Sequence, residues 1–457
     1  MVKMVRYTVC LLLFIWGVLF SAHAQDYLVS TSDKEILVPR KEIKDRGFDQ
    51  PGGKFGSEYK AESENFVLFW EKSFGNDPTQ YADPEKRFHP EKILKEAERF
   101  YHHYVEKLKF VEKGRSYTDK YKMIIWMHND NETTVYGWGG DKVGMMWMRP
   151  CRAKSYPYCA LAHEMGHSFQ YMVNADGKRG FPGNPLVEYT SQWMLWQVYP
   201  EWTTIENYHL KSYMEKTHYA AFHETNMYHA PQLMEYWANK HGVDIIGRVW
   251  REAIKKEDPV LAYQRLTGIS QQEFNDEIYD AASRFVTWDI PRIETVCSQY
   301  ANQHSCKMNK VDNDCYEIAQ SRCPQNYGYN AIRLEIPEQG KKVAVSFEGI
   351  VGDKRFHPAR QEQANWRYGF LAVKQNGERV YGKMHIADNG KNKEVRFKVP
   401  ENTKFLWLVV AATPMVHNDY FKQWQQLKEE KGKEEEWPYR IRLKGTVPHT
   451  DVLQAKK

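Results

Sequence analysis

The spacing of apolar residues changes near residue 325, and this change predicts two kinds of architecture in one chain. Between residues 158 and 290, apolar positions recur at helical spacing, for example over 230–240 and 244–255. After residue 325, short alternating runs bounded by Gly, Asn and Asp follow one another, which is typical of an antiparallel β-sandwich. We therefore predict an α+β chain, with a mostly helical domain and a separate sandwich.

The helical domain is predicted over 64–295 with a small N-terminal sheet, after a polar, irregular arm over 25–63. Its strands are expected at 65–70, 121–127 and 142–148, with a helix at 90–110 and a glycine-rich turn at 137–140. A cysteine-rich connector over 296–325 leads to the sandwich over 326–446 and a tail over 447–457. Its strands are expected at 331–336, 342–347, 368–374, 394–399, 405–411 and 439–444. The charge run 428–436 is expected to be a solvated loop.

The N-terminus has the order of a secretory signal peptide. Lys3 and Arg6 precede the apolar run 9–20, and the small-residue site Ala22-His23-Ala24 follows it. A membrane-spanning helix needs about 20 apolar residues, so this run is too short. We predict a signal peptide over 1–24 and a secreted or periplasmic protein with no transmembrane segment. The residue directly after Ala24 is Gln25 and not cysteine, so no lipoprotein anchor is expected.

Charge and cysteine content narrow the classes of protein further. The chain has 64 Lys and Arg against 59 Asp and Glu, and two of the basic residues lie in the signal, so the remaining net charge of +3 gives no reason to expect a nucleic-acid partner. Six cysteines follow the signal, an even number that favours disulfides in an oxidising compartment, with free thiols as the alternative. They lack the C-x-x-C pairs of a structural zinc site.

The segment 158–171, YCALAHEMGHSFQY, contains the motif H-E-x-x-H at residues 163–167. In a helix, His163 and His167 lie one turn apart on the same face, so both imidazoles can bind one zinc ion. Glu164 then lies beside the metal, where a carboxylate can take a proton from a water molecule. The motif therefore indicates zinc-dependent hydrolysis.

A third ligand is expected downstream of this motif. Pro185 opens a predicted helix that carries Glu188 in its first turn, and Asp176 in the intervening loop is the alternative. The metzincin pattern would require glycine and histidine three and six residues after His167. Gln170 and Val173 occupy these positions, so the metzincin class is excluded.

The stretch 120–200 resembles the catalytic core of gluzincin metallopeptidases, with HEMGHSFQ as the zinc helix and VEYTSQW as the helix that brings the third ligand. It is also similar to secreted families with an H-E-x-x-H-x-x-Q signature. The resemblance implies a zincin-like fold for 64–295, His163, His167 and Glu188 as Zn²⁺ ligands, and Glu164 as general base. Thermolysin-like members often carry Asp four residues after the ligand Glu, whereas this chain has Gln192, which can accept a hydrogen bond but has no charge.

Further residues are assigned around the same site. The strand at 142–148 is expected either as the edge strand that pairs with an extended substrate or as a core strand. Tyr228, and after it His229, are candidates for stabilising the oxyanion. Cys151 and Cys159 bracket the turn before the zinc helix and are expected to pair. Four further cysteines are expected to form two bridges in one of three connectivities: Cys297, Cys306, Cys315 and Cys323.

Together these features predict a secreted zinc metallopeptidase acting on a protein, peptide or glycoprotein substrate. Two other classes stay open: a non-catalytic binding protein on a peptidase scaffold, and a carbohydrate-active or carbohydrate-binding protein, which the many Trp and Tyr residues suggest. The intact Glu164 argues against the first alternative, because a binding scaffold has no need of the base. The second lacks a recognisable pair of catalytic carboxylates.

Overall fold

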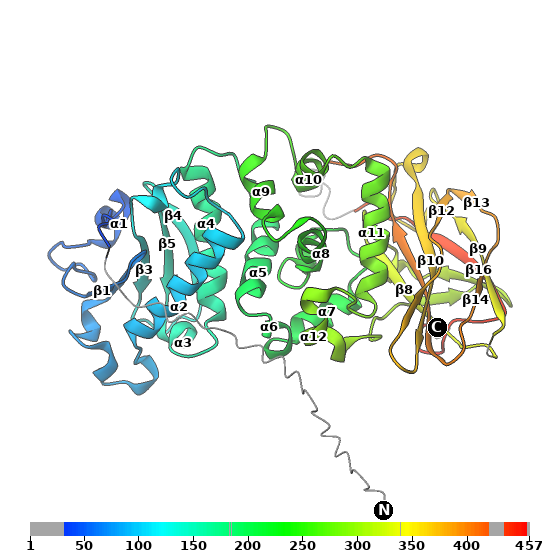
Figure 1. Ribbon diagram of the computed structural model, residues 1–457, viewed down its shortest axis with the longest axis horizontal. Coiled ribbons are helices and arrows are strands. Elements are labelled where there is room, and N and C mark those ends of the chain that lie inside the picture. The colour runs from blue at the N-terminus through cyan, green and yellow to red at the C-terminus, as the bar shows by residue number, and fades with distance from the viewer. Residues whose placement is uncertain (1–31, 182, 184, 339, 420–433, 455–457) are drawn as a thin grey trace, which may run out of the picture.

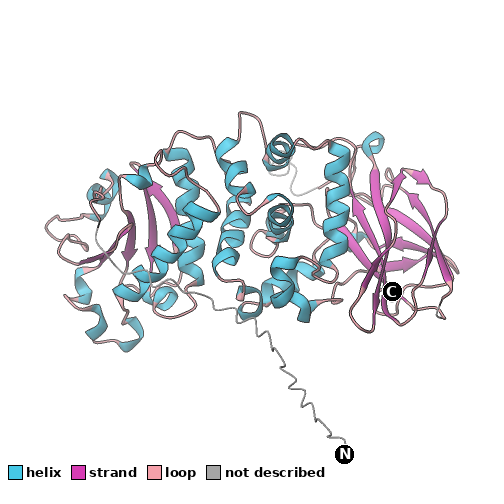
Figure 2. Cartoon of the chain, in the orientation of Figure 1, coloured by secondary structure: helices cyan, strands magenta, loops and turns pink. Residues whose placement is uncertain are grey.

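The computed structural model describes residues 32–181, 183, 185–338, 340–419 and 434–454. Their elements form three blocks in a row (Figure 1): an N-terminal sheet with helices, a helical block and a two-sheet sandwich. Helices lie beside the N-terminal sheet and form the middle block, whereas the last block consists mainly of antiparallel strands (Figure 2), which agrees with a mixed α+β fold. The expected signal peptide lies outside the described residues, and within them no helix has the length and apolar character needed to cross a membrane.

The N-terminal sheet has the strand order β1-β2-β3-β5-β4, in which β2, β3 and β5 are parallel and both outer strands are antiparallel. The segment 142–148, expected as either an edge strand or a core strand, is β5, which lies inside the sheet with every residue buried, as the second alternative predicts. The expected glycine-rich turn is part of the edge strand β4. Glycine is uncommon inside strands, so its clustering suggested a turn. The strands are β1 (Lys60–Glu62), β2 (Phe66–Trp70), β3 (Met123–Met127), β4 (Tyr136–Gly140) and β5 (Val143–Met148).

The three parallel strands β2, β3 and β5 are buried on both faces, because their side chains alternate between two apolar clusters. Phe66 and Leu68 belong to the main core, which the helices share, whereas Val67 and Phe69 face the opposite side. That side is covered by the segment expected to be an irregular arm, which includes β1 and the helix α1 (Arg40–Arg46) and contributes buried phenylalanines. The arm is therefore an integral layer of the fold.

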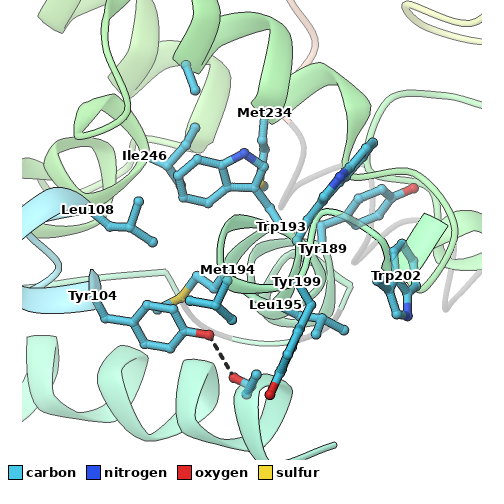
Figure 3. Close-up of a cluster of buried hydrophobic side chains, with 14 of the residues drawn as sticks. Tyr104, Leu108, Tyr189, Trp193, Met194, Leu195, Tyr199, Trp202, Met234 and Ile246 are labelled. Atoms are coloured by element: carbon cyan, nitrogen blue, oxygen red, sulfur yellow. Dashed lines mark hydrogen bonds between the residues drawn. The ribbon is translucent and has the colours of Figure 1, made fainter. Parts of the chain in front are cut away.

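The helical block is built on two helices that pack against each other, α4 (Cys159–Ala175) and α5 (Leu186–Val198). Figure 3 shows the core beside them, where the Tyr104 hydroxyl donates to the Ala162 carbonyl at 3.0 Å. The predicted helix at 90–110 is α2 (Pro90–His102), followed by a π-helical turn, His103–Lys107. The remaining helices are α3 (Pro150–Ala153), α6 (Trp202–Ile205), α7 (Tyr208–Glu215), α8 (Gln232–His241), α9 (Ile245–Glu252), α10 (Pro259–Thr267), α11 (Gln271–Phe285) and α12 (Pro291–Cys297). Short 3₁₀ turns lie at Lys72–Phe74, Pro78–Gln80, Pro84–Lys86, Tyr117–Asp119, Glu224–Asn226, Ser298–Tyr300, Gln320–Arg322 and Gln361–Gln363.

The sandwich consists of two antiparallel sheets. One has the order β11-β10-β15-β8 with β12 beside β10, and the other has the order β13-β9-β16-β7-β6 with β14 beside β9. All six predicted sandwich strands are present, and the predicted connector supplies β6 and β7 in addition. The strands are β6 (Met308–Lys310), β7 (Cys315–Ile318), β8 (Tyr329–Leu334), β9 (Lys342–Gly349), β10 (Asn365–Lys374), β11 (Arg379–Tyr381), β12 (His385–Asp388), β13 (Gly390–Lys391), β14 (Val395–Lys398), β15 (Thr403–Ala412) and β16 (Tyr439–Lys444).

The sandwich shares its core with the helical block. In β15, Leu408 faces the second sheet, whereas Trp407 and Val409 belong to the same apolar cluster as the helices. Arg367 of β10 is fully buried and its Nε lies 2.9 Å from Asp276 Oδ1 on α11. The expectation of a separate module therefore needs correction, because the strands β8, β10 and β15 of one sandwich sheet are buried on both faces.

Two local expectations also differ from the structure. The six cysteines of the described residues are free thiols, so the predicted bridges are absent; Cys151 is exposed and Cys159 is buried, so the two thiols face different surroundings. Of the charge run expected to be solvated, residues 428–433 lie outside the described residues, but Glu434 and Glu436 are buried. Glu436 accepts a hydrogen bond from a backbone N–H at 2.8 Å, which offsets the cost of its burial.

Candidate metal site

Close packing of α4 against α5 brings together the residues of the predicted zinc site. Gly166 lies between the two histidines of the motif, and a Cβ atom there would lie 2.8 Å from Ser191 Oγ and 3.1 Å from Ser191 Cα. The missing side chain therefore lets α5 approach α4. As a result Glu188, in the first turn of α5, reaches His163 and His167.

The three predicted ligands converge on one point. The two imidazole Nε2 atoms lie 3.0 Å apart, and Glu188 Oε2 lies 3.1 Å from His163 Nε2 and 3.3 Å from His167 Nε2. In a tetrahedral zinc site with bonds of about 2.0–2.1 Å, neighbouring ligand atoms lie about 3.3 Å apart. The three atoms therefore fit one face of such a tetrahedron, and the fourth position faces the cleft. No other set of three His, Cys, Asp or Glu side chains in the described ranges is grouped this closely.

Two glutamines orient the imidazoles for metal binding. Gln192 Nε2 donates to the Tyr228 carbonyl at 3.0 Å, so its Oε1 faces His163 Nδ1 at 3.3 Å. Gln170 Nε2 donates to the Val187 carbonyl at 2.9 Å, so its Oε1 faces His167 Nδ1 at 3.2 Å. An oxygen at that position requires Nδ1 to carry the proton, which leaves an Nε2 lone pair pointing into the site. Without a metal, a second proton on Nε2 can instead donate to Glu188 Oε2, and a bound cation would take the place of these protons.

The charges of the ligands are coupled. Burial alone would raise the pKa of Glu188, but hydrogen bonds from both imidazoles lower the pKa far below its usual value. Burial would lower the pKa of His167, and the hydrogen bond to Glu188 reverses the direction and raises the pKa. The carboxylate is therefore ionised at neutral pH and supplies the negative charge that a divalent cation needs.

A cleft of about 770 Å³ opens over these ligands. Glu164 lines the cleft, and its carboxylate forms no hydrogen bond with another side chain in the described part of the chain. The strand β4 forms one wall, because Gly137 packs directly on α4: a Cβ atom there would lie 1.8 Å from the Glu164 carbonyl oxygen. The lining residues also include Thr133, Thr134, Trp138, Arg152, Glu206, Tyr208, His209 and Tyr228.

The structure separates the two candidates for oxyanion stabilisation. Tyr228 lines the cleft, with its ring centroid 6.2 Å from that of His163, and burial followed by the charge of Glu188 raises its pKa to about 12. His229 is not among the residues that line the cleft. Its Nδ1 lies 2.7 Å from Nδ1 of His209, and His209 does line the cleft. The structure therefore places only Tyr228 of the two candidates in the lining of the cleft.

The alternative third ligand is also placed elsewhere. Asp176 follows the end of α4 and accepts a hydrogen bond from the Tyr117 backbone N–H at 2.9 Å. Two residues beside His167 were not predicted from the sequence: Ser191, whose Oγ lies 3.0 Å from His167 Nδ1, and Gln170, whose Oε1 faces the same nitrogen. The glutamine three residues after the second histidine of the motif was the available signal.

Comparisons with known proteins add a family assignment. No curated protein matches the chain. Three similar solved structures are PirA (12% identity, TM-score 0.14, 27% of this chain and 83% of that chain), a family 22 carbohydrate-binding module of Clostridium thermocellum Xyn10B (11%, 0.17, 30% and 74%) and the copper-binding protein CorA of Methylomicrobium album BG8 (10%, 0.17, 31% and 98%). At TM-scores this low, none of these likenesses bears on fold or function. A family model described as a family of unknown function, DUF6055, matches residues 28–450, and the chain therefore belongs to this family.

Proposed function

We propose that this protein is a zinc-dependent metallopeptidase of the gluzincin type, with His163, His167 and Glu188 as the zinc ligands. The observation that carries the proposal is the convergence of three ligand atoms at 3.0–3.3 Å, with each imidazole oriented by a glutamine oxygen. Zinc bound there would act as a Lewis acid on a scissile carbonyl and would increase the acidity of water. With the signal peptide predicted over 1–24, the proposed enzyme acts outside the cytoplasm.

Two residues of the cleft supply proton transfer and charge stabilisation. Glu164 follows a ligand directly in α4 and faces the cleft, so its carboxylate can accept a proton from the attacking water and later donate it to the leaving amine. Because the pKa of Tyr228 is raised to about 12, its hydroxyl keeps its proton at neutral pH and can donate to the developing oxyanion.

The edge strand β4 supports an extended polypeptide as substrate. The strand order ends with β4, so within the described residues no strand pairs with its outer edge, which borders the cleft. An extended peptide can add to such an edge through main-chain hydrogen bonds. We therefore propose a peptide, protein or glycoprotein substrate, which would lie along β4 with one peptide bond above the ligands.

The proposal is tested by metal analysis and proteolysis on the mature chain. We expect one zinc per chain, loss of zinc in His163→Ala, and a Glu164→Gln variant that keeps zinc but cleaves casein at least 10³-fold more slowly, since the amide preserves shape and loses the base. Glu58→Gln, at an exposed glutamate outside the cleft, is the control and should behave as the parent. Parent-rate cleavage by Glu164→Gln, or zinc bound without Glu188, would refute the mechanism. Zinc binding without cleavage of any peptide would favour the non-catalytic binding protein.

A further inference from the structure

The packing of β4 against α4 fixes the direction of the cleft. A Cβ atom on Gly137 would lie 1.8 Å from the Glu164 carbonyl oxygen, and a Cβ atom on Gly139 would lie 2.0 Å from the Tyr171 ring. Higher residue numbers in β4 therefore meet higher numbers in α4, so the strand and the helix run in the same direction. The residues just before β4, Thr133 and Thr134, lie toward the beginning of α4.

This direction orders a bound peptide, if the proposed peptidase function is accepted. Antiparallel pairing is the commoner arrangement at a free strand edge. An antiparallel peptide on β4 runs from the Trp138 end of the cleft toward the Thr133 end. The substrate residues that follow the scissile bond would then lie beside the beginning of α4, where Arg152 and Glu206 also line the cleft.

Arg152 is the positive charge at this end of the cleft. It lies on α3, is exposed, and its guanidinium forms no ion pair or side-chain hydrogen bond with any described residue. Arg149, on the preceding turn, is different: it is buried, and its guanidinium contacts Asp130 and Glu132 at 2.9 Å. The two arginines therefore divide into one that stabilises the fold and one that faces the cleft.

The neighbouring acid, Glu206, is already engaged. Its Oε2 accepts a hydrogen bond from Trp202 Nε1 at 2.9 Å and lies 3.5 Å from His209 Nε2. The hydrogen bond with His209 is the main cause that lowers the pKa of Glu206. The charge of Arg152 also lowers the pKa of Glu206, more weakly than His209 does and without a hydrogen bond between the two side chains. The donors of the Arg152 guanidinium therefore stay open to whatever occupies this end of the cleft, and a planar, permanently charged fork is suited to a carboxylate.

We propose that Arg152 binds a carboxylate of the substrate on the C-terminal side of the scissile bond. The carboxylate can be an Asp or Glu side chain or the α-carboxylate of the peptide. This inference names a substrate class for the proposed peptidase, and it predicts carboxylate-dependent binding whether or not cleavage follows.

The test measures binding to the zinc-loaded mature chain carrying Glu164→Gln, by fluorescence anisotropy. The probes are decapeptides of Ala and Leu with an N-terminal fluorescein, carrying one Glu or one Gln at each position in turn, each with a free or an amidated C-terminus. We expect the best carboxylate peptide to bind about tenfold more tightly than its neutral partner, as for a charge-assisted bidentate contact. A difference in affinity between the Glu and Gln peptides shows recognition of a side-chain carboxylate. A difference between the free and amidated C-termini shows recognition of the α-carboxylate.

Arg152→Gln should abolish this preference and Arg152→Glu should reverse it, whereas Arg40→Gln, at an exposed arginine outside the cleft, should leave it unchanged. The inference is overturned if the Arg152→Gln variant keeps the carboxylate preference. It is also overturned if the parent enzyme shows no carboxylate preference in binding or in kcat/KM. If the parent protein cleaves none of these peptides but the Arg152-dependent preference is measured, the peptidase proposal fails and the carboxylate site stands. If the parent protein cleaves peptides but shows no carboxylate preference, the carboxylate site fails and the peptidase proposal stands.

Discussion

Replacing Gly137 by alanine should damage the cleft, because β4 lies against α4 with no room for a side chain. The new Cβ would lie 1.8 Å from the Glu164 carbonyl oxygen and 2.6 Å from the carbonyl carbon. Ordinary contacts begin at 3.4 Å, and both atoms belong to the backbone of a buried helix, so relief requires the strand to move. Overpacking of this kind costs about 1–3 kcal/mol or more, and we expect the upper part of that range.

Gly140→Ala is the matched control in the same strand. Its Cβ would lie 3.4 Å from the Met145 side chain, which is flexible, so the free energy of unfolding should change by less than about 0.5 kcal/mol. For a chain of this size, about 1 kcal/mol corresponds to about 1 °C in Tm. Scanning calorimetry should therefore place Gly137→Ala about 3 °C below the parent and Gly140→Ala within about 0.5 °C of it.

The two variants should also differ in activity. The three proposed zinc ligands lie on α4 and α5, so Gly137→Ala should keep most of its zinc, while the displaced strand lowers kcat/KM on a peptide substrate at least tenfold. Equal Tm values and equal kcat/KM values for Gly137→Ala and Gly140→Ala would show that β4 does not pack on α4 as described, and the cleft geometry would be wrong.

Four further outcomes are expected. Gln192→Leu removes the oxygen that orients His163 and should weaken zinc affinity about 10–100-fold in chelator competition, an effect that unchanged affinity would contradict. Tyr228→Phe should keep zinc but lower kcat about 10²–10³-fold with little change in KM; an unchanged kcat would remove the oxyanion role. Burial raises the pKa of Glu434 to about 7, above its unfolded value of 4.5, so the folded chain holds the proton more tightly and the free energy of unfolding should fall as pH rises from 4.5 to 7; Glu434→Gln should flatten this dependence in urea titrations. A fragment of residues 25–325 should be insoluble on expression, since it exposes the α11 surface that β10 and β15 cover, and a soluble, folded fragment would refute the shared core.

The candidate site follows from sequence where short-range geometry decides it. The spacing of His163 and His167 on one helix fixes their common face, and a helix start near residue 185 places Glu188 in a first turn. Gln192 was correctly expected to accept a hydrogen bond without carrying charge. The strands at 65–70 and 439–444 were found nearly as predicted, because their apolar runs are bounded by polar residues.

The remaining features depend on contacts that no local pattern encodes. The glycines of β4 predict a turn when only the sequence is known. In the structure they lie in a strand, because α4 occupies the space where their side chains would be. His229 and Tyr228 are neighbours in sequence, but the loop conformation sends only Tyr228 into the cleft. Both faces of β10 are buried. The sequence signal for this burial is the apolar run Tyr368–Ala372, which lacks the alternating polar residues of a strand with one face in water.

The sandwich and the candidate site are joined by the loop that carries Tyr228. The backbone N–H of Tyr329 in β8 donates to Thr217 at 2.8 Å, and the Gln325 N–H donates to His218 at 2.8 Å. Gly328 permits this approach, because a Cβ there would lie 2.2 Å from the His218 carbonyl oxygen.

The far end of the same loop is held from the metal side, where Gln192 donates to the Tyr228 carbonyl at 3.0 Å and accepts from His163. The loop that carries Tyr228 is thus held by β8 of the sandwich at one end and by Gln192, beside the proposed metal ligand His163, at the other. The family model spans both regions, over 28–450. Displacing β8 should therefore shift Tyr228 and lower kcat while His163, His167 and Glu188, which lie on α4 and α5, keep their mutual distances.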